Sequence, residues 1–535
     1  MNSPAKPLLA QHAIDFGALP LWGDLCDRLA DAFGDKTAFV NVDGAALSFD
    51  GYRQRVNRLN NALAARGVKK GDRVAILARN CTEYAETYGL AKSGYIVVPL
   101  NWRLTRDELG RLLEHCAPAV VIADAHHVAA IDGLRPNLGS THSFVAIGIT
   151  AAGWLDYEAL LASAIAAVPQ PDAVLVPSDV ICLMYTSGTT GQPKGVALTH
   201  RGILANARTS AQSILHLTPQ DRTLAAMPMF HAGGMWYHFH GSYAAGCTTV
   251  IMSGFDAPRV LETLAREAIT NVHLVPTMIS ALLADPSIDK VDLGALRLIF
   301  YAASSIPLDL LKRALAQFEG CDFIQSYGST EAGMITDLSA ADHLRAIREG
   351  KEQLLLSCGR PAPGNTVRIV DDNGGARPAC EIGEVEIFSP GRMARYWNDD
   401  AATRAALVDS WFRSGDLGYQ DEEGYLYLVD RKNDMIVTGG ENVYPSEVEA
   451  VIAADPAVAM VSVFGVPDPV WVERVVAAVV LRPGVQATPE QIIARGRTQL
   501  AAYKCPKQVV VYQELPMNAA GKILKKELKL AFGKQ

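Results

Sequence analysis

The chain lacks several features that would mark whole classes of protein. Its nine cysteines are scattered and no two form a CxxC pair, which is typical of reduced thiols in a cytoplasmic protein. The net charge is −8 and no block of basic residues stands out. Nucleic acid is therefore not an expected partner, because its binding requires a basic surface.

Long apolar runs are also missing. No uninterrupted run approaches the roughly 18 residues that a membrane-spanning helix needs. The N-terminal sequence MNSPAKPLLAQHAIDFGALP has no basic stretch followed by an unbroken apolar run, so it does not resemble a signal peptide. We expect a cytoplasmic protein without a transmembrane segment, for which contact with a membrane would be peripheral.

The patterns that are present predict an α/β fold. With 535 residues, the chain is too long for one ordinary domain. In the first half, helical spacing at 22–34 and 83–94 alternates with short apolar runs at 72–80, 95–101 and 120–124. Such alternation is typical of an α/β core with parallel strands.

The pattern changes after Asn365. Three short strand-like segments separated by Gly-rich and Asp-rich turns indicate a small β-rich module. Beyond it, helical segments at 446–454 and near 488–500 and strands at 458–468 and 473–484 indicate a compact α+β domain. We predict a large N-terminal domain of α/β subdomains plus the β-rich module, residues 1–432, and a small mobile C-terminal domain, residues 433–535.

The strongest local motif is YTSGTTGQPKG, residues 185–195. Its glycines let backbone N–H groups turn toward an anion, its hydroxyls add donors, and Lys194 adds a positive charge, which together indicate triphosphate binding. A Walker A loop is excluded because Pro193 precedes the lysine and Gly195 follows it. The predicted ATP-binding residues here are Thr186, Ser187, Gly188, Thr189, Thr190 and Lys194.

Together with five further motifs in order, this loop resembles the adenylate-forming superfamily of acyl-CoA synthetases and related ligases. The resemblance covers nearly the whole chain. In YGSTE, residues 327–331, it implies that Tyr327 stacks on adenine beside Gly328, that Thr330 contacts the α-phosphate, and that Glu331 holds Mg²⁺ together with Thr190. These roles are chemically reasonable, since Mg²⁺ prefers a carboxylate plus phosphate oxygens and a planar base prefers an aromatic face.

Two more motifs extend the resemblance toward the C-terminus. In SGDLG, Asp416 is implied to accept hydrogen bonds from the ribose hydroxyls, and Arg431 is implied to reach the same ribose. The segment DRKND then marks the hinge of the family, where this chain has Asn433. Asparagine tolerates unusual backbone angles, so we expect domain rotation to be retained.

The resemblance also implies residues for CoA and for catalysis. Gly439 and Gly440 would line the channel for the pantetheine arm, and Lys522 in PMNAAGK would bridge the carboxylate and the α-phosphate. Further CoA-binding candidates are Glu441, Trp471 and Lys507.

The motif MPMFHAGG, residues 227–234, bears on the substrate. Adenylation domains of peptide synthetases usually carry Asp where this chain has His231, so an amino-acid substrate would lack a partner for its ammonium group. In members of the family this His or a nearby aromatic residue gates the acyl pocket, so the resemblance also makes His231 a catalytic candidate. The predicted pocket wall comprises Trp236, Tyr237, Phe239, Ala302 and Ala303, and residues 223–255, 299–307 and 323–330 contain no Asp, Glu, Lys or Arg.

The sequence therefore predicts an AMP-forming acid–thiol ligase that uses ATP, Mg²⁺ and CoA. Its substrate is expected to be a small-molecule carboxylic acid, and a homodimer is compatible with the sequence. A medium- or long-chain fatty acid is the first expectation for the acid, and a benzoate- or hydroxycinnamate-type acid is the alternative. A peptide-synthetase adenylation domain, a luciferase-like oxidase and a non-catalytic adenylate-binding protein are the remaining alternatives. The presence of all the charged candidate residues argues against a non-catalytic protein. These residues are Lys194, Glu331, Asp416, Arg431 and Lys522.

Overall fold

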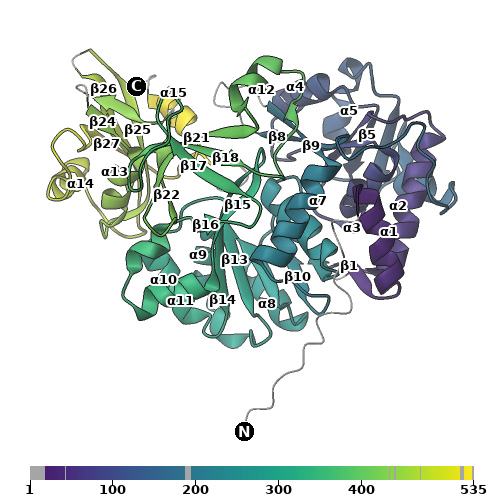
Figure 1. Ribbon diagram of the computed structural model, residues 1–535, viewed down its shortest axis with the longest axis horizontal. Helices are drawn as coiled ribbons and strands as arrows, with labels where there is room; N and C mark the ends of the chain where they lie inside the picture. The colour runs from purple at the N-terminus through teal and green to yellow at the C-terminus, as the bar shows by residue number, and fades with distance from the viewer. Residues whose placement is uncertain are drawn as a thin grey trace, which may run out of the picture. The chain divides into compact units, whose positions relative to one another are not determined.

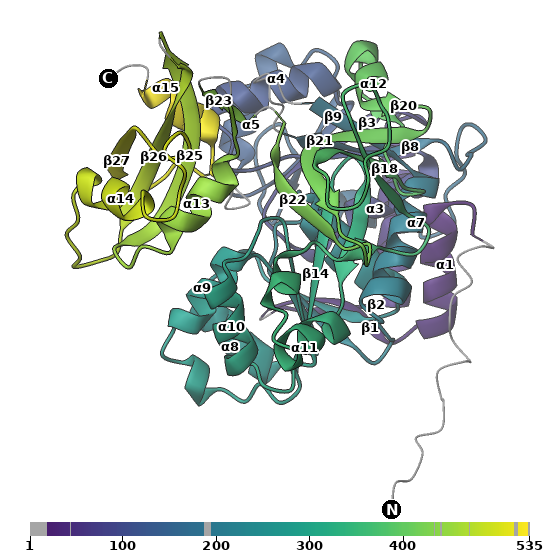
Figure 2. The same cartoon turned by 60° about the vertical axis from the view of Figure 1, so that its left-hand side comes forward.

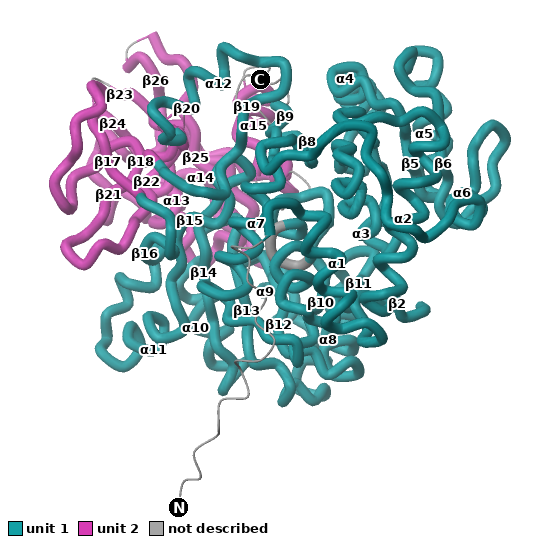
Figure 3. The backbone as a smooth tube through the Cα atoms, turned by 45° about the vertical axis from the view of Figure 1, so that its right-hand side comes forward, with its two compact units in different colours: residues 1–366, 387–412 teal, residues 367–386, 413–535 magenta. Residues whose placement is uncertain are grey.

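The computed structural model describes residues 19–42, 44–186, 194–432, 434–438, 441–469, 471–517 and 523–532, without the side chains of 236–238. The chain forms two compact units (Figure 3). Residues 1–366 and 387–412 make the first unit, and residues 367–386 and 413–535 make the second. The predicted hinge residue Asn433 lies outside the described residues, so the domain boundary at 432/433 stays a prediction.

The first unit contains an eight-stranded sheet that is parallel over most of its width. Its order is β19-β9-β8-β4-β3-β5-β6-β7, and only β8–β9 and β9–β19 are antiparallel pairs. The strands are β3 (Arg73–Leu77), β4 (Ile96–Pro99), β5 (Val120–Asp124), β6 (Ser143–Ile147), β7 (Leu155–Asp156), β8 (Val180–Thr186), β9 (Lys194–Thr199) and β19 (Arg395–Tyr396).

A nine-stranded sheet forms the rest of this unit, in the order β16-β15-β14-β13-β12-β10-β11-β1-β2. The inner strands are parallel, and β2, β15 and β16 are antiparallel at the two edges. The strands are β1 (Thr37–Asn41), β2 (Ala46–Ser48), β10 (Arg222–Ala225), β11 (Thr248–Ile251), β12 (Asn271–Leu274), β13 (Leu298–Ala302), β14 (Asp322–Ser329), β15 (Gly333–Leu338) and β16 (Arg360–Pro361).

Amphipathic helices pack against both sheets of this unit. Helix α1 buries Trp22, Leu25 and Leu29 at helical spacing and packs beside α2 (Figure 1). The helices are α1 (Trp22–Phe33), α2 (Phe49–Ala64), α3 (Thr82–Tyr88), α4 (Arg106–Cys116), α5 (Val128–Asp132), α6 (Tyr157–Ala162), α7 (His200–Arg208), α8 (Ala257–Arg266), α9 (Pro276–Ala284), α10 (Leu308–Gln317), α11 (Ala340–Arg348) and α12 (Asp400–Ala406).

Shorter helices complete the first unit. The 3-10 helices are η3 (Gly89–Ser93), η4 (Arg135–Asn137), η7 (Ile288–Lys290) and η8 (Glu352–Leu356). Two segments, η5 (Thr209–Ile214) and η6 (Gly234–Ser242), are π-helices that pack on each other. π-helical turns are rare, and those that occur often lie at functional sites. The π-helix η6 is therefore a candidate for a functional segment.

The second unit begins with β-hairpins. Strands β17 (Thr366–Val370), β18 (Gly383–Phe388) and β21 (Trp411–Gln420) lie in order, and β22 (Leu426–Arg431) pairs with β21. The short β20 (Leu407–Val408), which belongs to the first unit, continues this sheet by pairing with the first residues of β21. These strands are the predicted β-rich module.

A five-stranded sheet forms the remainder, with strands β24-β23-β26-β25 in order and β27 on β26 (Figure 2). Alternate residues of β25 and β26 face opposite sides, as strand geometry requires. Val463 and Val475 pack with α13 and α14, whereas Phe464 and Val476 pack with α15. The elements are β23 (Ile436–Thr438), β24 (Glu441–Val443), α13 (Pro445–Ala453), β25 (Val458–Asp468), β26 (Val472–Leu481), α14 (Pro489–Gly496), β27 (Gln508–Tyr512) and α15 (Lys525–Phe532).

The predicted fold class, α/β with a smaller α+β C-terminal part, is confirmed by these sheets. The strands predicted at 120–124 and 458–468 correspond to β5 and β25 residue for residue. Among the described residues, no helix is both long and apolar enough to cross a membrane.

Candidate active site

Several predicted residues lie at one edge of the nine-stranded sheet. Strands β10, β12, β13 and β14 are parallel neighbours, so their carboxyl ends share an edge. His231 follows β10, Ala302 is the last residue of β13 and Ala303 comes directly after it, and Glu331 follows β14. This edge is where ligands of open α/β sheets bind.

Glu331 is held in the tight turn between β14 and β15. Its backbone carbonyl accepts a hydrogen bond of 2.6 Å from the Met393 N–H, and its carboxylate accepts one of 3.1 Å from the Tyr396 hydroxyl. The turn requires glycine at position 328, because a Cβ there would lie 2.5 Å from the Gly333 carbonyl oxygen. Tyr327 is half-buried in β14, and Thr330 is half-buried in the turn.

Two predicted residues of the glycine-rich motif, Thr186 and Lys194, lie in the described part of the chain, and Lys194 has a described side-chain contact. It begins β9 and lies opposite Thr186, the last residue of β8. Its Nζ lies 4.8 Å from the centroid of the Tyr396 ring, within the range of a cation–π contact. The remaining predicted residues, Ser187, Gly188, Thr189 and Thr190, lie outside the described residues.

Tyr396 therefore contacts both Lys194 and Glu331, although no sequence motif identified it. The hydroxyl reaches the carboxylate, and the ring faces the ammonium group. A signal was present in principle, because the segment around Tyr396 contains aromatic and basic residues in PGRMARYWND. Only the pairing of β19 with β9 places that segment beside the end of the glycine-rich motif.

The acyl-pocket candidates differ in their surroundings. Burial, with Arg103 as the second cause, lowers the pKa of His231 to about 4, so its imidazole is neutral near pH 7. Ala302 is half-buried, and Ala303 is exposed with φ of 76°, an uncommon conformation for a residue other than glycine and one that recurs at binding sites. The side chains of Trp236 and Tyr237 lie outside the described residues.

Phe239 occupies a different environment from an open pocket wall. It is 1% exposed in η6. Its ring packs with those of Trp22, Phe39, Tyr52, Tyr88 and Tyr243. The structure thus places this side chain in an aromatic core, and its contact with substrate stays a prediction.

The predicted ribose-binding residues lie in the second unit and contact each other. Asp416 and Arg431 are opposite one another in β21 and β22. The Arg431 Nε lies 2.6 Å from Asp416 Oδ1, and the aspartate is buried whereas the arginine is exposed. The arginine thus orients the buried Asp416 carboxylate, and contact of either residue with a ribose stays a prediction.

The predicted CoA-binding residues include one exposed aromatic–cation pair. Trp471 is 46% exposed, and the Lys507 Nζ lies 5.8 Å from its ring centroid. The same Nζ donates to the Ala502 carbonyl at 3.1 Å, and the next residue, Tyr503, which the sequence analysis did not name, is 37% exposed. Glu441 is exposed opposite Thr438. Gly439, Gly440 and Lys522 lie outside the described residues.

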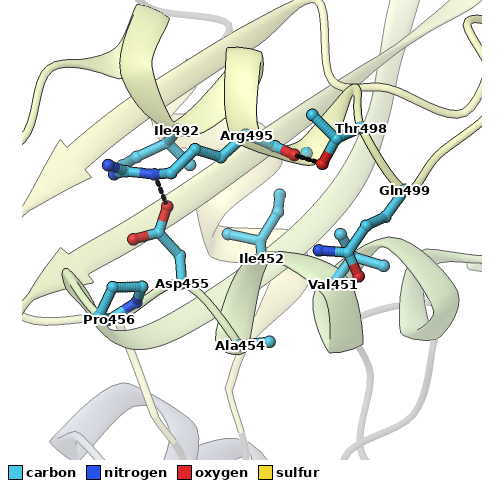
Figure 4. Close-up of a pocket in the computed structure, with 10 residues that line it drawn as sticks. Val451, Ile452, Ala454, Asp455, Pro456, Ile492, Arg495, Thr498 and Gln499 are labelled. Carbon is cyan, nitrogen blue, oxygen red and sulfur yellow. Dashed lines mark hydrogen bonds and ion pairs between the residues drawn. The ribbon is translucent and has the colours of Figure 1, made fainter.

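A pocket of about 280 Å³ lies between α13 and α14 (Figure 4). Its apolar floor includes Ile452 and Ile492, and at its rim Arg495 forms an ion pair with the buried Asp455. None of the predicted site residues lines it. The pocket therefore gives no support to the predicted chemistry.

Comparison with known proteins identifies the family of this chain. Residues 26–397 match the family of AMP-binding enzymes, and residues 447–522 match the C-terminal domain of AMP-binding enzymes. The chain belongs to the AMP-binding enzyme family.

This AMP-binding enzyme is similar to ligases of more than one acid. It is 37% identical to the indoleacetate–CoA ligase of Aromatoleum aromaticum, over 94% of this chain and 96% of that protein. It is 36% identical to the long-chain-fatty-acid–CoA ligase FadD13 of Mycobacterium tuberculosis, over 88% and 90%. The ATP-bound structure of MatB from Rhodopseudomonas palustris superposes with a TM-score of 0.86 at 29% identity, covering 95% of this chain and 99% of that one.

The predicted activity is confirmed by this membership: the protein is an AMP-forming acid–thiol ligase that uses ATP and CoA. The donors also fit Mg²⁺. Within the described part of the chain no three His, Cys, Asp or Glu side chains cluster as a metal site. Mg²⁺ commonly binds through one or two carboxylates plus substrate phosphates, which the single carboxylate of Glu331 and ATP would supply.

Proposed function

We propose that this AMP-binding enzyme joins a monocarboxylic acid with an apolar tail to CoA. In the first step, a carboxylate oxygen of the acid attacks the α-phosphorus of ATP, the bond to the β-phosphate bridge breaks, and pyrophosphate leaves. In the second step, the CoA thiolate attacks the acyl carbonyl, and AMP leaves with the electron pair of the broken C–O bond. The thiol proton passes to solvent.

The site residues supply positioning and charge. Lys194 and the hydroxyls of Thr186, Ser187, Thr189 and Thr190 would bind the triphosphate. Glu331, with Thr190, would hold Mg²⁺, which neutralises phosphate charge when bound. Tyr327 and Gly328 would flank the adenine, Asp416 and Arg431 the ribose, and Thr330 and Lys522 the α-phosphate. No covalent nucleophile is needed, because preorganised charges account for this class of displacement.

The acid is inferred mainly from the uncharged edge of the site. The His231 imidazole, with a pKa near 4, is neutral, and Ala302 and Ala303 add no charge. A second carboxylate would therefore have no charged partner among these three residues, whereas an apolar tail gains about 0.8 kcal/mol for each buried CH₂. Arg103 is a cation near His231. Its guanidinium carbon lies 4.1 Å from the centroid of the Trp102 ring, and burial lowers the pKa of Arg103.

A medium- or long-chain fatty acid is the first candidate, in line with the relative named for long-chain fatty acids. An aromatic or alicyclic acid is the second candidate. It is favoured by the relative named for indoleacetate and by the Trp-Tyr-His-Phe run at 236–239. Both candidates have a single carboxylate on an apolar body.

The acceptor subsite belongs to the same proposal. Trp471 and Tyr503 would offer aromatic faces to the adenine of CoA, and Lys507 would offer its charge to the phosphates. Glu441 would flank Gly439 and Gly440 at the pantetheine channel. The exposed fractions of both aromatic rings, 46% and 37%, support this assignment, because a core residue would be buried.

The acid is tested by a panel of kcat/KM values for acetate, malonate, octanoate, palmitate, benzoate and a hydroxycinnamate. We expect octanoate or palmitate to lead. Preference for malonate or acetate would contradict the apolar pocket, and preference for benzoate or the cinnamate would select the second candidate. The variant Ala302→Leu should lower kcat/KM for the preferred acid while the KM for ATP stays unchanged.

Location and assembly are also proposals. We infer a cytoplasmic enzyme that forms homodimers and meets membranes only peripherally. Light scattering after gel filtration measures the assembly, and a mass of one chain at micromolar concentration would contradict the dimer. Sedimentation with lipid vesicles measures the membrane contact.

A further inference from the structure

Backbone hydrogen bonds hold Tyr396 in place independently of the contacts that its side chain makes. In β19 it lies opposite Val196 of β9, and its N–H donates to Thr403 Oγ1 at 3.0 Å. The next N–H, of Trp397, donates to the Gly195 carbonyl at 2.7 Å. The residue is 5% exposed, so its ring has little room to move.

The side chain of Tyr396 connects the two charges of the candidate phosphate site. Its hydroxyl lies 3.1 Å from Glu331 Oε1, and its ring centroid lies 4.8 Å from Lys194 Nζ. One carboxylate oxygen is thereby engaged by the hydroxyl. The direction of the carboxylate follows from that hydrogen bond, since a neutral donor to an ionised acceptor makes a strong contact.

A buried asparagine ties together the two segments that carry these residues. From α7, Asn206 Nδ2 donates to the Gly391 carbonyl at 2.9 Å, and Asn206 Oδ1 accepts from the Met334 N–H at 3.2 Å. The Met393 N–H adds a direct bond to the Glu331 carbonyl. The backbone around Glu331 and the segment leading to Tyr396 therefore cannot shift independently.

We propose that Tyr396 is a positioning residue for acid activation. Its hydroxyl aims the Glu331 carboxylate at the metal bound with ATP, and its ring holds Lys194 at the triphosphate. The inference rests on the proposed roles of Glu331 and Lys194. It adds a residue that acts through both of them and that touches neither the acid nor the thiol.

The test is the affinity for ATP without turnover, measured by isothermal titration calorimetry with Mg²⁺ and again with EDTA. The ratio of the two affinities reports the metal contribution. Tyr396→Phe keeps the ring, so the EDTA affinity should stay unchanged while the ratio falls roughly three- to tenfold, the scale of one ordinary net hydrogen bond. Tyr396→Leu should also weaken the EDTA affinity by a few fold, because Lys194 loses the aromatic face.

Two reference variants separate the explanations. Tyr52→Phe removes another buried hydroxyl, which donates to the Ala85 carbonyl at 3.0 Å, and should lower the melting temperature without changing the ratio. Glu331→Gln should abolish most of the metal contribution. If Glu331→Gln leaves the ratio unchanged, the proposed metal role is wrong. If it lowers the ratio but Tyr396→Phe does not, or Tyr396→Phe weakens both affinities equally, the positioning role is wrong.

Discussion

Individual charged residues of the site depend on neighbours in different ways. Lys194 lies over the ring of Tyr396, and Glu331 accepts a hydrogen bond from the hydroxyl of the same tyrosine. Asp416 instead pairs with Arg431 across two strands. Lys522 lies outside the described residues, so its role is tested by its effect on the two half-reactions.

The first residue-scale prediction concerns Lys522. Lys522→Ala should lower acyl-adenylate formation by about 10²- to 10³-fold, the scale for removing one preorganised charge contact. Thioester formation from supplied acyl-AMP should persist, because the α-phosphate displacement is already complete. Pyrophosphate exchange measures the first step, and release of AMP from acyl-AMP and CoA measures the second.

A matched control is available three residues along the chain. Lys525 forms an ion pair with Glu449 at 3.0 Å, so it has a structural partner. Lys525→Ala should leave both half-reactions near their normal rates. Equal losses of both half-reactions in Lys522→Ala would indicate a folding defect and contradict the catalytic role.

At the scale of elements, the β14–β15 hairpin is closely packed against α7. Gly333 has φ of 77°, and a Cβ there would lie 1.9 Å from Asn206 Oδ1. The buried Asn206 is itself bonded to this hairpin and to the segment at 391. The turn that carries Glu331 therefore tolerates no side chain at position 333.

Gly333→Ala should lower the melting temperature and the rate of pyrophosphate exchange together. The substitution forces both a left-handed alanine, at about 1 kcal/mol, and a displacement of Asn206, for a total of several kcal/mol. Gly320→Ala is the control, because Gly320 has φ of 81° with no atom within 4 Å of an added Cβ. Equal melting temperatures for the two variants would contradict the packing argument.

At the scale of the molecule, five buried or partly buried histidines set the response to acid. Burial is the largest cause in each case and lowers their pKa values to about 4 for His200, His231 and His343, and to about 3 for His240 and His273. In the unfolded chain they would titrate near pH 6.5. As the pH falls below 6.5, these histidines become protonated in the unfolded chain but stay neutral in the folded protein. Proton binding therefore stabilises the unfolded state.

Two acids act in the opposite direction. Burial raises the pKa of Glu86 to about 7 and that of Asp337 to about 6, so the folded state binds protons that the unfolded state would not. The histidines outnumber them. The free energy of unfolding should therefore fall as the pH is lowered from 6.5 to 5, by up to about 4 kcal/mol for each pH unit at the lower end.

Urea unfolding at pH 7, 6 and 5 measures this slope, with the free energy of unfolding taken from the first transition at each pH. Replacing one buried histidine, as in His240→Gln, should make the slope shallower by about one proton, or ~1.4 kcal/mol for each pH unit. A free energy that rises on acidification would show that Glu86 and Asp337 dominate.

The sequence determined the features that depend on near neighbours in the chain. The helical spacing of 22–34 predicted α1, and buried apolar runs predicted β3, β4 and β5, because periods of 3.6 and 2 follow from local backbone geometry. The glycine-rich motif predicted phosphate binding from its residue types and spacing, and this stays a prediction because residues 187–193 lie outside the described residues. The π-helical form of η6 was not foreseen, since no simple sequence period encodes it.

Only the tertiary structure decided which distant residues meet. Tyr396 and Glu331 are 65 positions apart, and Asn206 and Gly391 are 185 apart. Their contacts depend on strand order and register, which local patterns do not specify. Burial likewise gave His231 its neutral imidazole and placed Phe239 in the aromatic core, because solvent exposure is a property of the assembled fold.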